Sequence, residues 1–273
     1  MNFQEKLDAA IEKNNSLLCV GLDPEYEKLP PHIKDNPNPF FTFNKAIIDA
    51  THDLVNSYKP NSAFYEAKGA DGILELKKTM EYLKKTYPSI PVILDAKRAD
   101  IGNTNRLYAR YAFDYVGADA ITLHPYVGRE GIETFLSYKD KGCIILCRTS
   151  NPGAKELQDT IVNGKKFYLH VAGLVSKNWN TNGNCMLVVG ATYPAELKEI
   201  REHVGDSITF LIPGVGAQGG SVEQSVKAGI NKNKKGVIIS TSRVVLYASS
   251  GENFAERARE EALKLRNEIN KYR

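Results

Sequence analysis

The sequence lacks any long apolar run. A membrane-spanning helix needs about 20 consecutive apolar residues, and no segment of the 273 residues approaches that length. The first residues, MNFQEKLDAAIEKNNS, have the pattern of a charged amphipathic helix and not the apolar core of a signal peptide. We therefore expect no membrane association and a cytoplasmic location.

Cysteine and histidine are also scarce. The five histidines are scattered along the chain, and none of the four cysteines belongs to a CxxC pair. Because a metal site needs clustered ligands, the sequence predicts no metal centre. The cysteines lie in or beside apolar segments, which favours reduced thiols in a core. They are Cys19, Cys143, Cys147 and Cys185.

Neither sign of charge dominates. The chain has 36 basic and 32 acidic residues, a net charge of +4, which is too small an excess to indicate a nucleic-acid partner. The one dense basic cluster, residues 231–235 (NKNKK), is interpreted as a solvated turn. With 42% apolar and 25% charged residues, the composition is typical of a globular protein.

What the sequence does contain is a series of short β-rich runs. Several are almost wholly apolar, as expected for parallel strands buried on both faces. Helix-like stretches separate them, for example residues 71–86, 106–115, 195–203 and 254–272. The eight predicted strands are Leu17–Leu22, Leu54–Lys59, Val92–Asp95, Ala120–His124, Cys143–Cys147, Met186–Gly190, Thr209–Pro213 and Gly236–Ser240.

Strands that alternate with helices predict βα units. Eight such units predict an α/β fold of the (β/α)8 TIM barrel type, formed as a single domain by residues 1–273. A doubly wound open sheet is the alternative, but the Gly-x-Gly-x-x-Gly opening of a dinucleotide-binding domain is absent after the first strand. The longest connection, residues 151–184, is predicted to hold one helix around residues 167–178.

Polar residues stand where the predicted strands end, which is where barrel enzymes place their active sites. The third strand ends in an Asp-x-Lys-x-x-Asp motif, Asp95, Lys97 and Asp100. On an extended strand Asp95 and Lys97 point to the same side, and Lys59 and Asn61 have the same relation on the second strand. The pattern predicts an array of alternating charge, formed by Lys59, Asp95, Lys97 and a further carboxylate.

Such an array favours acid catalysis. Neighbouring carboxylates raise the pKa of Lys97 and hold it as an ammonium group. A lysine that forms an imine needs a depressed pKa, whereas a protonated lysine can donate a proton to a developing carbanion or stabilise its charge. An ordinary ion-pair network at a strand end is the alternative, because the Asp-x-Lys-x-x-Asp spacing alone is weakly specific.

The seventh and eighth predicted strands are each followed by a candidate anion-binding segment. Residues 213–220 (PGVGAQGG) are rich in glycine, and residues 240–243 (STSR) end in an arginine. In barrels, the loops after these two strands often bind phosphate through backbone N–H groups. Arg243 could add a bidentate contact. A flexible turn beside a surface arginine is the alternative.

Taken with these features, six segments resemble the orotidine 5'-phosphate decarboxylase family, and most closely its longer bacterial subgroup. The likeness covers essentially the whole chain, and the D-x-K-x-x-D-I-G-N-T string is its most specific part. The segments are residues 21–24 (GLDP), 58–61 (YKPN), 94–104 (LDAKRADIGNT), 148–153 (RTSNPG), 213–218 (PGVGAQ) and 242–243 (SR).

The resemblance implies decarboxylation of orotidine 5'-monophosphate to UMP, the last step of pyrimidine nucleotide synthesis, without a metal or organic cofactor. Lys97 would protonate C6 of the pyrimidine as carbon dioxide leaves, and Asp95 would lie near the substrate carboxylate. Lys59 and Asp100 would complete the charged array. The resemblance also implies a homodimer with shared active sites, in which Asp100 and Thr104 serve the site of the partner.

The resemblance further implies a set of substrate-binding residues. The ribose hydroxyls would be held by Asp23 and Asn61. The others are Ile101 and Pro213 beside the pyrimidine, Thr149 or Ser150 at the base amide, Gln218 between base and phosphate, and Gly220, Ser242 and Arg243 at the phosphate.

Three other functions compete with this one. A sugar-phosphate decarboxylase of the 3-keto-gulonate-6-phosphate type would depend on a divalent metal and an acidic residue from the second strand, where this chain has Lys59 and Asn61. A lysine-imine aldolase would be trapped by borohydride. A barrel that only binds nucleotide would hold UMP without turnover.

Overall fold

The computed structural model describes residues 1–216 and 219–273. Each of the eight predicted strands is present, although their ends are shifted. The largest shifts are in the second strand, which begins at Ser57 and not at Leu54, and in the third strand, which ends at Arg98 and not at Asp95. The strands are β1 (Leu18–Gly21), β2 (Ser57–Lys59), β3 (Ile93–Arg98), β4 (Ala120–Leu123), β5 (Gly142–Arg148), β8 (Cys185–Val189), β9 (Phe210–Pro213) and β10 (Val237–Thr241).

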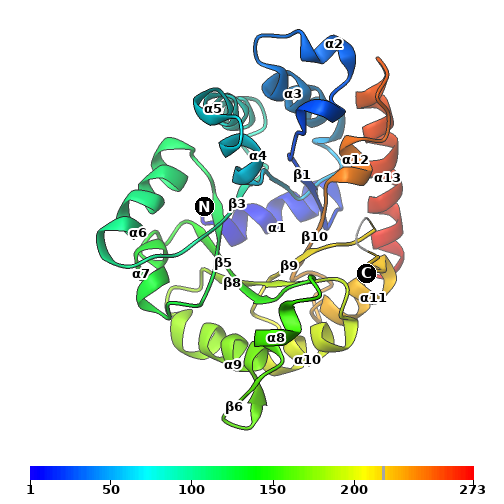
Figure 1. Ribbon diagram of the computed structural model, residues 1–273. Coiled ribbons are helices and arrows are strands. Elements are labelled where there is room, and N and C mark those ends of the chain that lie inside the picture. The colour runs from blue at the N-terminus through cyan, green and yellow to red at the C-terminus, as the bar shows by residue number, and fades with distance from the viewer. Residues whose placement is uncertain (217–218) are drawn as a thin grey trace.

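These strands form a parallel barrel (Figure 1), which confirms the predicted TIM barrel. Their order around the sheet is β2-β1-β10-β9-β8-β5-β4-β3. Two isolated parallel bridges, Tyr58 to Val92 and Asn61 to Asp95, join β2 to β3 and bring the ends of the sheet together. The strands are buried along most of their length, as the apolar runs predicted.

Helices surround the barrel. The predicted helices at 71–86, 106–115, 195–203 and 254–272 are present, the second one ending in a π-helical turn over Arg110–Tyr115. The helices are α1 (Phe3–Asn14), α2 (Pro31–Lys34), α3 (Pro39–Thr51), α4 (Ser62–Glu66), α5 (Gly69–Thr86), α6 (Gly102–Ala109), α7 (Glu130–Leu136), α8 (Ala154–Gln158), α9 (Phe167–Gly173), α10 (Pro194–Val204), α11 (Val222–Gly229), α12 (Arg243–Leu246) and α13 (Phe254–Lys271). No helix in the described ranges is both long and apolar enough to span a bilayer.

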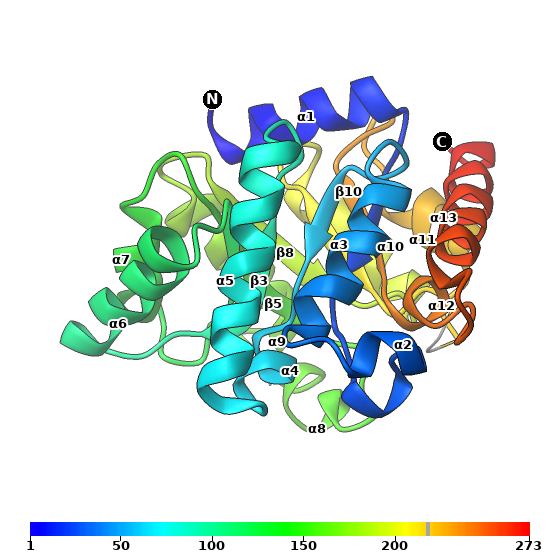
Figure 2. The ribbon, with the colours of Figure 1, turned by 90° about the horizontal axis from the view of Figure 1, so that it is seen from above.

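The N-terminal amphipathic helix closes one end of the barrel. Figure 2 shows α1 lying across the end opposite to α4 and α8. The side chain of Asn2 accepts a hydrogen bond from the backbone of Glu5 and the Glu5 side chain accepts one from Asn2, a capping box that fixes where α1 begins. Phe3 and Leu7 are buried on its inner face. The strands exit at the opposite end of the barrel, which is where barrel enzymes carry their active sites.

The connection between β5 and β8 contains more than the single helix that was predicted. Besides α9 it holds α8 and a hairpin of β6 (Ile161–Val162) and β7 (Lys165–Lys166). Asn163 and Gly164 both have positive φ, 51° and 74°, as a two-residue Asn-Gly hairpin turn requires. The prediction missed the hairpin because each strand is too short to show any periodicity.

Buried polar groups also support the fold. Arg201 on α10 donates hydrogen bonds to four backbone carbonyls, those of Gly205, Ile208, Gly229 and Gly236. Its guanidinium lies 3.8 Å from the ring centroid of Phe210. The four predicted core cysteines are all buried and free, and residues 231–235 form a turn between α11 and β10, as predicted.

Candidate active site

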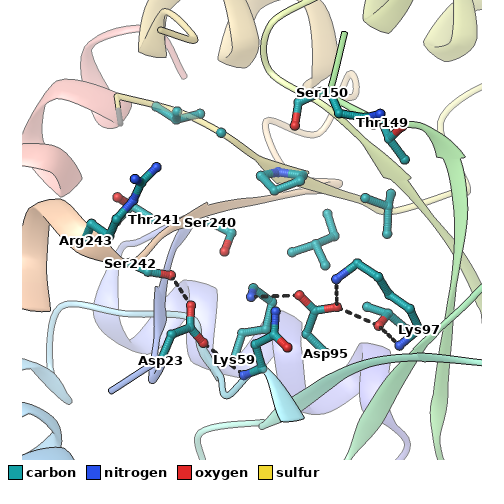
Figure 3. A pocket seen from close by; sticks show the side chains of 18 of the residues that line it. Asp23, Lys59, Asp95, Lys97, Thr149, Ser150, Ser240, Thr241, Ser242 and Arg243 are labelled. Atoms are coloured by element: carbon teal, nitrogen blue, oxygen red, sulfur yellow. Dashed lines mark hydrogen bonds and ion pairs between the residues drawn. The ribbon is translucent and has the colours of Figure 1, made fainter. Parts of the chain in front are cut away.

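The strand exits surround a cavity of about 620 Å³. Figure 3 shows the Asp95 carboxylate between Lys59 and Lys97. Thr149, which follows β5, and Arg243, the first residue of α12, line the same cavity. The predicted site residues that line it are Asp23, Lys59, Asn61, Asp95, Lys97, Thr149, Ser150, Pro213, Ser242 and Arg243. Residues that lie far apart in the sequence therefore meet at one end of the barrel, as the strand-exit pattern predicted.

Asp95 is the centre of the charged array. Its Oδ2 lies 3.2 Å from Nζ of Lys59, and its Oδ1 lies 2.6 Å from Nζ of Lys97. Burial raises the pKa of Asp95, but the two ammonium groups outweigh burial and hold the pKa well below its usual range. Burial likewise lowers the pKa of Lys59, and the carboxylates of Asp95 and Asp23 outweigh it, so that the pKa of Lys59 is raised.

The Lys59–Asp95 pair therefore stays charged over a wide pH range. The lowered pKa of Asp95 contributes stability that is complete above its unfolded value, about 3.9, and is lost as the pH falls through the folded value. The raised pKa of Lys59 contributes stability below its unfolded value, about 10.4, and this is lost as the pH rises through the folded value. Both contributions are present at neutral pH.

Lys97 reaches Asp95 by a different route from the one predicted. The prediction placed both residues on an extended strand, but Lys97 has a φ of 47°, and the pairing of β3 with β4 shifts register between Leu94 and Arg98. A β-bulge re-aims the side chain and breaks the simple alternation. The two charged groups still meet, because the bulge turns the Lys97 side chain back toward Asp95.

Asp23, Asn61 and Ser242 form a second polar group. Asp23 Oδ2 accepts a hydrogen bond from the Ser242 hydroxyl at 2.6 Å, and its Oδ1 accepts one from the Asn61 backbone at 2.9 Å. Gly21 makes this contact possible, since a Cβ on Gly21 would lie 1.9 Å from Ser242 Oγ and 2.9 Å from Asp23 Oδ2. A side chain at residue 21 would therefore displace the Asp23–Ser242 pair.

A Gly21→Ala variant is expected to lower kcat/KM by roughly 10–100-fold, because displacing binding groups by about 1 Å can cost that much. The loss should fall mainly on KM, since the charged array around Asp95 is left in place. Steady-state kinetics would show this split. Gly251→Ala is the matched control, because a Cβ at residue 251 meets only ordinary contacts at 3.4 Å or more. Equal losses of kcat/KM in both variants would contradict the prediction.

Hydrogen bonds from Gln158 on α8 hold the segment that follows β5. The Thr149 backbone N–H donates to Gln158 Oε1 at 2.9 Å, and Gln158 Nε2 donates to the Thr149 hydroxyl at 2.8 Å. That hydroxyl also donates to Asn151 Oδ1 at 2.6 Å. The fully buried guanidinium of Arg148 donates to the same Gln158 Oε1 at 3.2 Å. The Thr149 hydroxyl is therefore engaged within its own loop.

Ser150 lies closer to the neighbouring strand exit. A Cβ on Gly190 would lie 2.9 Å from Ser150 N and Cβ, so the missing side chain at Gly190 gives Ser150 its place at the cavity wall. At the glycine-rich segment, Pro213, Gly214 and Val215 line the cavity, but Gly220 does not. Gln218 lies outside the described residues.

Three further predicted site residues do not line the cavity of their own chain. Asp100, Ile101 and Thr104 lie between β3 and the first turn of α6, outside the lining. The Ile101 backbone N–H donates to Asp100 Oδ1 at 2.7 Å, and the Ile101 side chain is 58% exposed. These residues would have to act elsewhere than in the cavity of this chain.

The structure also places in the cavity a residue that the sequence interpretation missed. Thr122 on β4 lines the cavity, and its hydroxyl donates to Asp95 Oδ1 at 2.8 Å. The sequence signal for Thr122 was its polar side chain at an inward position of the otherwise apolar run AITL. The prediction also missed Gln158, because nothing in the sequence around it marks the short helix α8 as part of a functional site.

The fold and the cavity together define a class. The molecule is a TIM barrel whose strand exits carry a Lys–Asp–Lys array around the buried Asp95, beside a second polar group and a glycine-rich segment that follows β9. Comparisons with known proteins give the family. The family model described as Orotidine 5'-phosphate decarboxylase / HUMPS family matches residues 16–258.

Individual relatives match over their full length. The chain is 54% identical over 272 residues to the orotidine 5'-phosphate decarboxylase of Cellvibrio japonicus, covering 99% of this chain and 98% of that one. It is 50% identical to the enzyme of the same name from Dechloromonas aromatica, with complete coverage of both. The solved structure of Leishmania donovani OMP decarboxylase superposes with a TM-score of 0.87 at 36% identity, covering 100% of this chain and 98% of that one.

The chain belongs to the orotidine 5'-phosphate decarboxylase / HUMPS family, and it is a carboxy-lyase. The length and full coverage fit the longer bacterial subgroup that the sequence motifs indicated. The resemblance noted from six short segments is thereby confirmed.

Proposed function

We propose that this protein converts orotidine 5'-monophosphate to UMP and carbon dioxide, and that Lys97 delivers the proton to C6 of the pyrimidine. The observation that carries the proposal is the position of Lys97 in the cavity. Its ammonium group is 2.6 Å from Asp95, yet its side chain is 49% exposed. The side chain of Lys59 is only 6% exposed. Lys97 is thus the lysine of the array that a ligand in the cavity can meet most readily.

The chemistry requires a cation beside C6. Loss of carbon dioxide from C6 leaves a vinyl carbanion, and no ring position readily takes up its charge. A fixed ammonium group stabilises that charge as it develops and then supplies the proton. Asp95 would lie near the departing carboxylate and disfavour the bound ground state, although its main effect is to keep both lysines charged and in place.

The remaining cavity residues suit the rest of the nucleotide. Asp23 and Asn61 would bind the ribose hydroxyls, and Arg243 with Ser242 would bind the phosphate. The contact with the base amide falls to Thr149 or Ser150, which both line the cavity. Pro213 would line the pyrimidine pocket. We keep the predicted roles of Gln218, between base and phosphate, and of Gly220, at the phosphate, as part of the proposal.

The reaction is tested by adding orotidine 5'-monophosphate to EDTA-treated protein and following the loss of the orotate chromophore. Turnover without added metal is expected. No turnover, together with magnesium-dependent decarboxylation of a sugar phosphate, would move the protein to the 3-keto-gulonate-6-phosphate type. Tight binding of UMP without any turnover would leave a nucleotide-binding barrel. The cytoplasmic location remains a prediction.

We further propose that two copies of the chain share their active sites. Asp100, Ile101 and Thr104 do not line the cavity of their own chain, and large apolar side chains are exposed beside them. Leu107 on α6 is 63% exposed, and Tyr126, which precedes the packed neighbour α7, is also exposed. Burial of this face against a second copy would remove apolar surface from water and bring Asp100 to the cavity of the partner.

Shared sites predict rescue by mixing inactive variants. In a hybrid of Lys97→Ala and Asp100→Ala subunits, one of the two sites carries neither substitution. Random exchange should therefore restore about a quarter of wild-type activity, since half of the dimers are hybrids with one intact site each. Mixing Lys97→Ala with Asp95→Ala is the control, because no site in that hybrid is intact. Absence of rescue, with subunit exchange demonstrated by tagged chains, would refute shared sites.

A further inference from the structure

Thr122 makes two hydrogen bonds within the charged array. Its hydroxyl accepts the backbone N–H of Lys97 at 3.0 Å and donates to Asp95 Oδ1 at 2.8 Å. The same Oδ1 accepts the Nζ donor of Lys97 at 2.6 Å. The Thr122 hydroxyl thus connects the backbone N–H of Lys97 to the Asp95 carboxylate. Because the Lys97 ammonium group contacts the same carboxylate, the three residues form a closed ring of hydrogen bonds.

The ring lies where the regular strand pairing fails. β3 and β4 pair regularly through Leu94, and the register has shifted when pairing resumes at Arg98. Between these two residues, Lys97 adopts a φ of 47°, a left-handed conformation that is costly for a residue with a side chain. Such a conformation persists only where its surroundings fix it, and the acceptor for the Lys97 N–H is a side chain and not a strand carbonyl.

We infer that Thr122 is a positioning residue for the decarboxylation: its hydroxyl holds Lys97 in the left-handed conformation that aims the ammonium group at the reacting carbon. The inference rests on the proposed role of Lys97 and requires no contact between Thr122 and the substrate. It assigns to β4 a part in the reaction, although the acid itself is on β3.

The side chain suits this task for two reasons. A hydroxyl can accept one hydrogen bond and donate another at the same time, which neither valine nor alanine can do. Threonine is also branched at Cβ, so packing restricts its χ1 and fixes the direction of the hydroxyl. Thr122 is only 1% exposed, so water is a poor substitute for the missing group in a variant.

The test compares Thr122→Val, which keeps the shape and removes the hydroxyl, with Thr122→Ser, which keeps the hydroxyl. We expect Thr122→Val to lower kcat by roughly 10–100-fold, with KM and the affinity for UMP within about threefold of wild type, because the contacts to ribose and phosphate are untouched. Thr122→Ser should recover most of kcat. Thr122→Ala serves as a second hydroxyl-free variant if the valine variant does not fold.

Thr209→Val is the matched control. Thr209 is a buried threonine whose hydroxyl donates to Gln4 at the α1 end of the barrel, so its loss should affect stability and not kcat. The inference is overturned if Thr122→Val retains kcat within threefold, if the serine variant is as impaired as the valine variant, or if kcat and UMP binding fall together.

A crystal structure of Thr122→Val separates this inference from the proposed function. We expect Lys97 to leave the left-handed region or its ammonium group to move more than 1 Å from its place beside Asp95. An unchanged Lys97 would overturn the inference whatever the activity. Wild-type protein that does not turn over orotidine 5'-monophosphate would overturn the proposed function and leave the positional result standing.

Discussion

Replacing Lys97 by alanine is expected to lower kcat by about 10⁴-fold or more. Loss of a general acid alone costs about 10²–10⁴-fold, and loss of a cation beside a developing negative charge adds to that. The second cation of the array cannot substitute, because Lys59 is buried on the other side of Asp95, 3.2 Å from Oδ2. UMP should still bind, since it lacks the carboxylate and its ribose and phosphate contacts remain.

The measurement is single-turnover decarboxylation beside a UMP titration. Lys232→Ala is the matched control, because Lys232 is an exposed lysine that lies outside the cavity, in the 231–235 turn, and this variant should keep full activity. A Lys97→Ala enzyme that retains more than a hundredth of wild-type kcat would remove Lys97 from the role of proton donor. A parallel loss of UMP binding would point instead to a collapsed site.

Replacing Arg201 by methionine is expected to destabilise the fold by roughly 3 kcal/mol, because buried carbonyls left without a donor cost about 1–3 kcal/mol each and only some can be resolvated. Its guanidinium donates to four carbonyls, one at the end of α11 and three in the segments that precede β9 and β10. Burial lowers the pKa of Arg201 to about 10, so the group is charged at neutral pH. The hydrophobic part of the side chain is largely preserved by methionine.

Urea unfolding of Arg201→Met and Lys198→Met gives the comparison. Lys198 lies on the same helix, one turn earlier, with an exposed side chain, so its replacement should change the free energy of unfolding by less than about 0.5 kcal/mol. A loss below 1 kcal/mol for Arg201→Met would mean that water or rearranged backbone satisfies the four carbonyls. The kcat of the folded variant should be unchanged, because Arg201 does not line the cavity.

The barrel could be predicted from the sequence because its strands are apolar and each is followed by a helix with a regular stripe. Leu76, Met80 and Leu83 on α5, for example, are all buried on one face. The general rule that barrel enzymes carry their sites at the strand exits then predicts that Asp23, Lys59 and Asp95 lie in one cavity, which they do.

The parts that could not be predicted depend on three-dimensional detail. The second strand begins later than predicted because the carbonyls of Leu54 and Val55 accept hydrogen bonds from the side chains of Ser16 and Asn14. These contacts between distant parts of the chain leave no signal in the local sequence. The left-handed backbone of Lys97 has no local sequence signal, since glycine or asparagine usually occupies such positions. Thr122 could be recognised only through its contacts with both members of the motif.

The place where the barrel closes offers a route by which residues outside the cavity could affect the charged array. β2 and β3 are joined only by isolated bridges, one of which pairs Asn61 with Asp95, and the Asp95 N–H donates to the Pro60 carbonyl at 2.9 Å. Asp95 is therefore part of the contact that closes the barrel. Helices α4 and α5 lie in the connection from β2 to β3. We therefore expect that substitutions on these helices change the distance between β2 and β3, and with it the distance between Lys59 and Asp95.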